Sequence, residues 1–232
     1  MAREGAAGST YGGRRVADEL IDIWDENMMP IGRETRTEAH KRGLWHTAIH
    51  CWVVRPELPG YVLFRRRAAG AVTGAGLYDV TATAHPESGE TVEDRLTQLT
   101  KELGLEDDDG GSSVVPLGVK IEVARLGYDV LIREFCPAYF VTSPRHPHAY
   151  ELDPGTLTAL VEIAIPDGLN LLAGRTERVE ARGIEYDVKD GAWRRIEIDV
   201  GPPQFFPRVD PYHYKVFIMA GRLLEGARDL AV

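Results

Sequence analysis

One segment of the chain, residues 91–103, has the apolar spacing of an amphipathic α-helix. Its apolar side chains recur at positions i, i+4, i+7 and i+11, which share one face of a helix (Val92, Leu96, Leu99 and Leu103). Thr91 stands three positions before Asp94, a pattern typical of a helix N-terminus, and Gly104 stands where a helix commonly ends. The spacing therefore predicts a helix that buries one face against the rest of the fold.

Short apolar runs on both sides of this helix have the length of β-strands. Two of them flank a Pro59-Gly60 turn, which predicts a hairpin of residues 48–54 and 61–64. The remaining predicted elements are strands at residues 77–83, 114–123, 130–141, 157–165 and 194–200, and helices at residues 167–173 and 210–224. This alternation predicts a single α/β or α+β domain over residues 16–232. A Gly-rich flexible tail is predicted at residues 1–15, and a solvated acidic loop at residues 106–109.

Composition and charge limit the classes of function. The 232 residues are 44% hydrophobic and 27% charged, with a formal net charge of −9, so a broad basic surface for nucleic acid is not expected. No apolar run reaches the ~18 residues of a membrane span, and the first residues lack the apolar core of a secretory signal. Two cysteines, Cys51 and Cys136, cannot form a disulfide framework. We expect a cytoplasmic protein that binds neither nucleic acid nor membrane.

Histidines and one glutamate form a candidate metal site. His40, His46 and His50 lie near the first strand of the predicted hairpin, His85 follows the strand at residues 77–83, and Glu134 lies in a later strand. Neutral imidazoles and a carboxylate suit Zn, Mn or Fe. Each histidine has a structural or surface role as its alternative, and spacing alone leaves both interpretations open.

The segment from His85 to Leu105 resembles the Nudix box, the loop–helix signature of the Nudix hydrolase superfamily. Residues 85–90 match its loop and residues 102–105 match its end, with an interval one residue shorter than in the family. The resemblance implies an α/β/α sandwich with a central mixed sheet. It also implies a divalent cation (Mg, Mn or Zn) near Glu90 and Glu102, which would polarise a diphosphate.

Within this superfamily, the sequence is similar to the type I isopentenyl diphosphate isomerases and their relatives. Residues 84–94 follow the pattern Gly-His-Pro-x-x-Gly-Glu-x-x-Glu-Asp except for Ala84, and residues 134–137 follow Glu-x-Cys-Pro. Residues 39–40 and 44–46 resemble the segments that carry the first two metal histidines. The resemblance implies a diphosphate-binding side chain at Arg67 and metal ligands at His40, His46, His85 and Glu134.

The box helix departs from the family pattern. The Arg-Glu pair of the box is Thr97-Gln98, and the first of the paired glutamates is Lys101, so Glu102 alone remains of the helix carboxylates. An ammonium at position 101 would repel a cation bound there. These departures therefore argue against ordinary Nudix hydrolysis at this helix.

The isomerase pattern is also incomplete. Thr83 stands where the isomerases have their catalytic cysteine, and a hydroxyl does not supply a readily ionised thiol. Ile132 replaces a second metal-binding glutamate, and Ala71 replaces a basic residue of the diphosphate site. The histidines and Glu134 are retained, which points to a metal site with an altered substrate.

Three functions follow from these residues. The first is hydrolysis of a diphosphate-linked small molecule, with Glu102 and Glu90 at the cation and Arg67 at the phosphate. The second is another metal-dependent reaction (an isomerase, lyase or cyclase) on a prenyl-type or non-diphosphate substrate. In that reaction Glu134 would be a metal ligand or an acid/base and Thr83 a hydrogen-bond donor. The third is a non-catalytic binding module, and a homodimer is compatible with all three.

Overall fold

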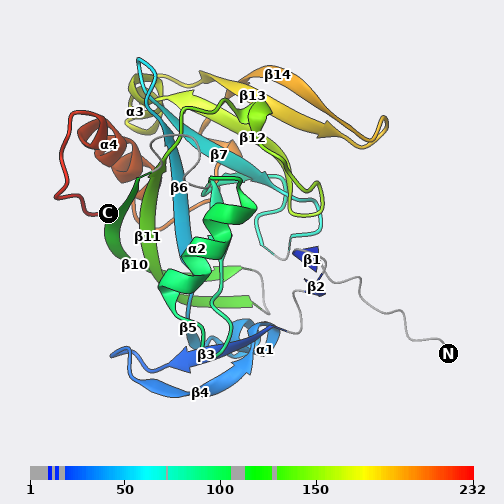
Figure 1. Cartoon of the computed structure of the whole chain (residues 1–232), viewed down its shortest axis with the longest axis vertical. Coiled ribbons are helices and arrows are strands. Elements are labelled where there is room, and N and C mark those ends of the chain that lie inside the picture. Colours follow the sequence, from blue (N-terminus) through cyan, green and yellow to red (C-terminus); the bar gives the residue numbers. More distant parts are fainter. Residues whose placement is uncertain (1–9, 12–13, 16–18, 72, 106–112, 127–129) are drawn as a thin grey trace.

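One twelve-stranded sheet runs through the computed structural model of the protein (Figure 1). The structure describes residues 10–11, 14–15, 19–71, 73–105, 113–126 and 130–232. The predicted acidic loop at residues 106–109 and most of the predicted tail lie outside these residues. The described part of the tail forms a separate antiparallel pair, β1 (Thr10–Tyr11) and β2 (Arg14–Arg15). The boundary between tail and domain stays a prediction.

The sheet is mixed, as predicted. Its strands follow the spatial order β14 (Ala192–Val200), β13 (Val179–Asp187), β12 (Leu157–Ala164), β7 (Tyr61–Arg67), β6 (Ile49–Arg55), β11 (Val130–Thr142), β5 (Trp45–Thr47), β3 (Leu20–Trp24) and β4 (Pro30–Thr35). Three further strands join it from the side: β10 (Val114–Leu126) on β11, β8 (Tyr78–Asp79) on β7, and β9 (Ala82–Ala84) on β6. Strand β11 runs parallel to β5 and to β6, and the other pairings among the described strands of this sheet are antiparallel.

Helices cover both faces of the sheet. The elements outside the sheet are α1 (Arg36–Arg42), α2 (Val92–Glu102), α3 (Ile165–Leu172), α4 (Tyr212–Leu224) and the short 3-10 turns η3 (Pro147–Ala149) and η4 (Pro202–Gln204). Alternate residues of β6 pack on opposite sides of the sheet. Val53 lies in the same hydrophobic cluster as Leu99 of α2, whereas Trp52 lies in the cluster that contains Phe217 of α4. The predicted α/β/α sandwich is confirmed. Among the described residues, no helix is long and apolar enough to span a membrane.

The helix predicted from residues 91–103 is α2, and its ends are set locally. The Thr91 hydroxyl accepts a hydrogen bond from the Asp94 backbone N–H at 3.1 Å, which satisfies one of the free donors of the first turn. Gly104 has a φ of +66°, a left-handed conformation that glycine adopts without a steric penalty. The hairpin β6–β7 and the two later helices also lie where the sequence predicts them, with ends shifted by up to three residues.

The strand predicted at residues 77–83 is instead two short strands, β8 and β9. They occupy the space where β6 and β7 diverge, because those two strands pair directly only at Val54–Val62 and Arg55–Tyr61. Between β8 and β9, the Thr81 hydroxyl accepts from the Val53 N–H at 3.0 Å and donates to the Leu63 carbonyl. One side chain therefore links the diverging strands where backbone pairing is lost.

Several elements have no counterpart in the sequence prediction, namely β3, β4, α1, β5 and β13. Helix α1 has seven residues, which is too short for an apolar period to repeat. In β13, Gly183 lies so close to β12 that an added Cβ would be 2.0 Å from the Leu160 carbonyl oxygen. A glycine inside a strand hides the alternating pattern that predicts strands.

Candidate metal centre

Helix α1 positions His40, although the sequence analysis did not predict this helix. The Thr35 hydroxyl accepts from the Glu38 N–H at its start, and Gly43 ends it in a left-handed conformation with its N–H bonded to the Ala39 carbonyl. Ala39 is fully buried, so the helix is fixed against the sheet. His40 lies four residues after Arg36, and residues at this spacing share one side of a helix. The helix therefore presents an imidazole and a guanidinium together.

Strand register positions His46 and Glu134 of the candidate site. His46 of β5 is the register partner of Glu134 in the parallel pairing of β5 with β11, so the two side chains emerge side by side. The Nδ1 of His46 lies 2.9 Å from the Leu44 carbonyl, which makes Nδ1 the protonated nitrogen and leaves the lone pair on Nε2. His85 follows β9, which pairs with β6 next to the same site.

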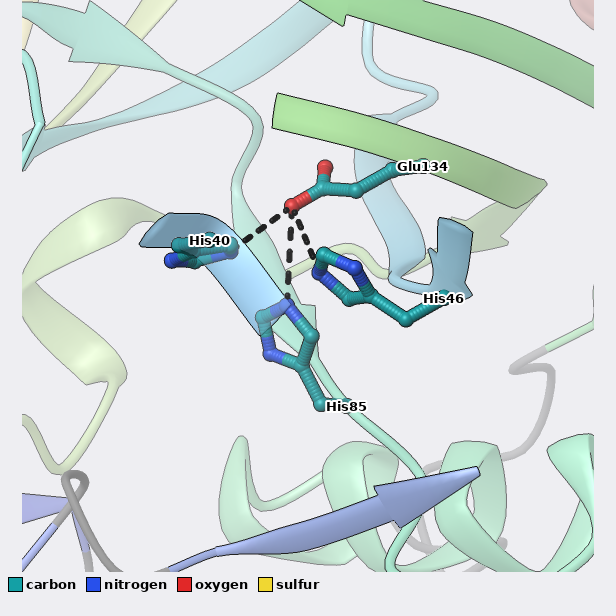
Figure 2. A group of neighbouring side chains, drawn as sticks. All are labelled: His40, His46, His85 and Glu134. Carbon is teal, nitrogen blue, oxygen red and sulfur yellow. Dashed lines mark ion pairs between the residues drawn. The ribbon is translucent and has the colours of Figure 1, made fainter. Parts of the chain in front are cut away.

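The imidazoles of His40, His46 and His85 converge on one carboxylate oxygen of Glu134 (Figure 2). Oε1 of Glu134 lies 3.3 Å from Nε2 of His46, 3.5 Å from Nε2 of His40 and 3.7 Å from Nε2 of His85. The three Nε2 atoms are buried and have no hydrogen-bond partner. The structure thus brings together the four residues for which the isomerase resemblance implies metal ligands, and their donor atoms lie within 4.8 Å of one another.

Burial and neighbouring charges shift the pKa values of three of these groups, His40, His85 and Glu134. Burial lowers the pKa of His40 and, together with the charge of Arg36, holds the pKa of His85 well below its usual value. Burial acts to raise the pKa of the Glu134 carboxyl, but the three imidazoles that face it hold this pKa well below its usual range. Neutral imidazoles that face an ionised carboxylate bring acceptor atoms together. A cation bound between these atoms would remove the repulsion between them.

The donor set and its spacing fit a divalent metal. Two ligands on a tetrahedral metal with bonds of about 2.1 Å lie about 3.4 Å apart, close to the observed separations. These separations exceed the ~3.2 Å of a good N–H···O hydrogen bond. Imidazole nitrogens with one carboxylate oxygen are a ligand set that Zn and Mn accept. The His46 contact to a backbone carbonyl also orients the ring in the way typical of ligating histidines.

A small cavity of about 50 Å³ opens beside the four residues. Its walls include six charged side chains, three cationic and three anionic: Arg36, Arg67, Arg208, Asp79, Glu122 and Glu134. Arg67 donates to Asp79 at 3.0 Å and to the Thr73 hydroxyl at 2.9 Å, while its Nε is buried without a partner. The cavity therefore combines the metal ligands with three guanidinium groups, each of which also pairs with a carboxylate.

The structure places the other predicted site residues differently. Thr83 lines the cavity, where its hydroxyl accepts a hydrogen bond from Arg65 at 2.6 Å. Glu102 is exposed on α2 and pairs with Arg95 at 3.1 Å, and Glu90 accepts from the Glu87 N–H within its own turn. Neither Glu102 nor Glu90 lines the cavity or belongs to the four-residue group. A role for either at the cation stays a prediction.

The sequence analysis missed several cavity residues. Arg36 could have been found from its spacing to His40, but only once α1 is known to be a helix. Asp79, Glu122 and Arg208 form a buried network in which Arg208 pairs with both carboxylates. These three come from distant segments, and nothing in the sequence around each one signals that they meet.

Comparisons with known proteins agree with this site. No protein-family model matches the chain. Over 206 residues it is 30% identical to an uncharacterized Nudix hydrolase of Clostridium acetobutylicum, a match that covers 88% of this chain and 98% of that protein. The chain belongs to the Nudix superfamily. The predicted resemblance is confirmed, and this Nudix protein also has isomerase-like relatives.

One such relative is an isopentenyl-diphosphate Delta-isomerase of Cereibacter sphaeroides. It is 39% identical over 89 residues, which cover 38% of this chain and about half (47%) of that enzyme. Among solved structures, a hypothetical Nudix protein of Deinococcus radiodurans has the same fold, with a TM-score of 0.51 at 19% identity over 67% of this chain and 90% of that one. The relatives indicate that this Nudix protein is an enzyme, hydrolase-like or isomerase-like, with a small-molecule substrate.

Proposed function

We propose that this Nudix protein is a metal-dependent hydrolase of a small diphosphate-linked molecule, with its cation held by His40, His46, His85 and Glu134. The observation that supports this most directly is the convergence of three partnerless Nε2 atoms on Oε1 of Glu134 at 3.3–3.7 Å. A divalent cation bound there would polarise a phosphoryl oxygen and lower the pKa of bound water.

The side chains around the cation divide the remaining tasks. Arg36 and Arg67 line the cavity and would supply positive charge to the diphosphate, while their guanidinium groups also pair with Glu19 and Asp79. Thr83 holds a hydroxyl at the cavity wall through its contact with Arg65. Glu134 would act as an anionic ligand, because a carboxyl whose pKa is held low is a poor general acid.

The cavity walls also favour a hydrophilic substrate. Asp79 and Glu122 are almost fully buried there, and their charges disfavour contact with a hydrocarbon chain, although Ala48, Ile132 and Phe206 give the same cavity some apolar surface. Their oxygens can accept hydrogen bonds from substrate hydroxyl or amino groups. This argues for a polar group rather than a prenyl group on the diphosphate.

The alternative is an isomerase, lyase or cyclase reaction at the same metal. The position of Glu102 favours it, because the remaining box carboxylate pairs with Arg95 outside the cavity, next to Lys101. A metal held by histidines also agrees with the isomerase-like relatives. A cytoplasmic location, a homodimer and the absence of nucleic-acid binding stay predictions.

The two reactions are separated by product analysis with matched variants. Purified enzyme is supplied with Mg²⁺, Mn²⁺ or Zn²⁺ and a panel of hydrophilic diphosphates and isopentenyl diphosphate, and released phosphate and isomerised product are both measured. Hydrolysis that is lost in His85→Ala and kept in the exposed control His146→Ala supports the proposal. Isomerised product without phosphate release supports the alternative, and activity that survives His85→Ala but not Glu102→Gln contradicts the histidine site.

A further inference from the structure

A second group of donor atoms lies one step further along β11. Glu134 and Cys136 are alternate residues of this strand and point to the same face of the sheet. His50 of β6 pairs in register with Ala138, the next residue on that face. One ligand atom each of His50, Glu134 and Cys136 lies within 4.8 Å of the other two, and all three residues are buried.

Glu134 belongs to both groups through different oxygens. Its Oε1 faces the three Nε2 atoms of the histidine cluster, while its Oε2 lies 3.8 Å from Sγ of Cys136. A carboxylate with its two oxygens directed at two sites is the usual bridge between paired metal ions. The geometry therefore places an imidazole and a thiol on one side of a bridging group and three imidazoles on the other.

The ring of His50 is held by neighbours outside the group. Its Nδ1 lies 3.0 Å from the Tyr212 hydroxyl, which also accepts a hydrogen bond from Trp52 Nε1 at 2.9 Å. This contact uses one ring nitrogen and leaves Nε2 for another partner. A histidine fixed through its second nitrogen is typical of metal ligands, because the contact sets the ring orientation.

The charges around Cys136 are balanced. Burial and the Glu134 carboxylate raise the pKa of this thiol well above its usual value, and the cationic Lys120 and Arg208 oppose this. Lys120 pairs with Glu122 at 2.8 Å, and Arg208 pairs with Glu122 and Asp79. A cation at the second group would thus not face an excess of positive charge. The other cysteine, Cys51, is equally buried but packs on the α2 side of the sheet.

We infer that His50, Glu134 and Cys136 bind a second divalent cation, with Glu134 as the bridge between two metal ions. The donor set of nitrogen, oxygen and sulfur favours Zn²⁺, since a thiolate is a soft ligand. Binding replaces the thiol proton, which is released to solvent as the metal–sulfur bond forms. The bridging part of this inference rests on the proposed function, which makes Glu134 a ligand of the first cation.

Titration of the metal-free full-length protein with Co²⁺ tests the inference, because a thiolate on Co²⁺ gives an intense charge-transfer band in the near ultraviolet. The native chain is expected to bind two equivalents, one of which produces the band. Cys136→Ser is expected to bind one equivalent without the band. Cys51→Ser removes the other buried thiol and is expected to match the native chain, and His50→Gln, which keeps both thiols, is expected to weaken the band-producing equivalent at least about 10-fold.

The outcomes separate this inference from the proposed function. One equivalent without a thiolate band overturns the second site, makes Cys136 a hydrogen-bond donor only, and leaves the histidine centre standing. Two equivalents in folded Cys136→Ser also overturn it. Retention of the band in His40→Ala with loss of the other equivalent supports two distinct sites. Failure of the native chain to bind any Co²⁺ or Zn²⁺ overturns both proposals.

Discussion

Nε2 of His46 lies 3.3 Å from Oε1 of Glu134 because the two residues are register partners in the parallel pairing of β5 with β11. A slip of this register by one residue would turn one of the two side chains to the opposite face of the sheet. The candidate metal centre therefore depends on the backbone pairing of a three-residue strand with the central strand of the sheet.

Replacing Glu134 with glutamine is expected to weaken metal binding while the shape of the side chain is kept. The amide lacks the negative charge that offsets the cation. Loss of a residue that only orients a ligand can weaken metal affinity by about 100-fold, so loss of a direct ligand should weaken it at least as much. Competition of Zn²⁺ with a chromophoric chelator measures the affinity. Glu57→Gln, an exposed glutamate outside the site, is the control for loss of a carboxylate charge, and an unchanged affinity in Glu134→Gln would contradict the site.

Gly43→Ala is expected to destabilise the fold and to loosen the helix that carries His40. Gly43 has a φ of +63°, and an added Cβ would lie 3.0 Å from Cβ of Leu131 on β11. Left-handed strain alone costs about 1–2 kcal/mol, and the close contact adds to it. Gly174→Ala, with a φ of +70° and no neighbour within 4 Å, isolates the strain. Urea unfolding should show the larger loss for Gly43→Ala, and only that variant should bind metal more weakly.

Removal of the Glu162 charge is expected to cost up to about 3–5 kcal/mol, because it leaves the buried Arg55 guanidinium with the exposed Glu57 in place of its buried bidentate partner. The two side chains form a bidentate pair, with Nε and Nη2 of Arg55 at 2.7 Å and 2.9 Å from the two carboxylate oxygens. Glu57 contacts the same arginine but is 66% exposed. Glu57→Gln should therefore change the free energy of unfolding by less than about 1 kcal/mol, against the larger loss in Glu162→Gln. Equal effects in urea titrations would refute this.

His213 is expected to make the protein less stable as the pH falls below 6.5. Burial lowers the pKa of this histidine in the folded state, despite the Asp79 carboxylate 3.6 Å from its Nε2. The unfolded chain then binds a proton at a higher pH than the folded chain does, so stability is lost as pH falls from the unfolded value toward the folded one. Urea midpoints at pH 7 and pH 5 should fall less for His213→Gln than for the native chain. The exposed control His146→Gln should follow the native chain, and a parallel decline in all three would rule the effect out.

The helix at residues 91–103 and the hairpin of β6 and β7 could be predicted because their signals are local. The helix has an apolar period and a Thr91–Asp94 capping pair, and the hairpin has two apolar runs around a turn. The seven-residue α1 and the glycine-containing β13 lack such patterns, so they were missed. The ligand types His40, His46, His85 and Glu134 could be named from resemblance, but their convergence could not be read from spacing.

The sequence by itself determined the fold class, the box helix and the residue types of the candidate centre, because periodicity, capping and motif spacing act over a few neighbouring residues. Only the tertiary structure decided which of these residues meet. It paired His46 with Glu134 across 88 positions, added Arg36 and Arg67 at the cavity, and left Glu102 in an exposed pair with Arg95. Such contacts follow from strand register and helix packing, which are fixed by burial of the whole sheet and not by any one segment.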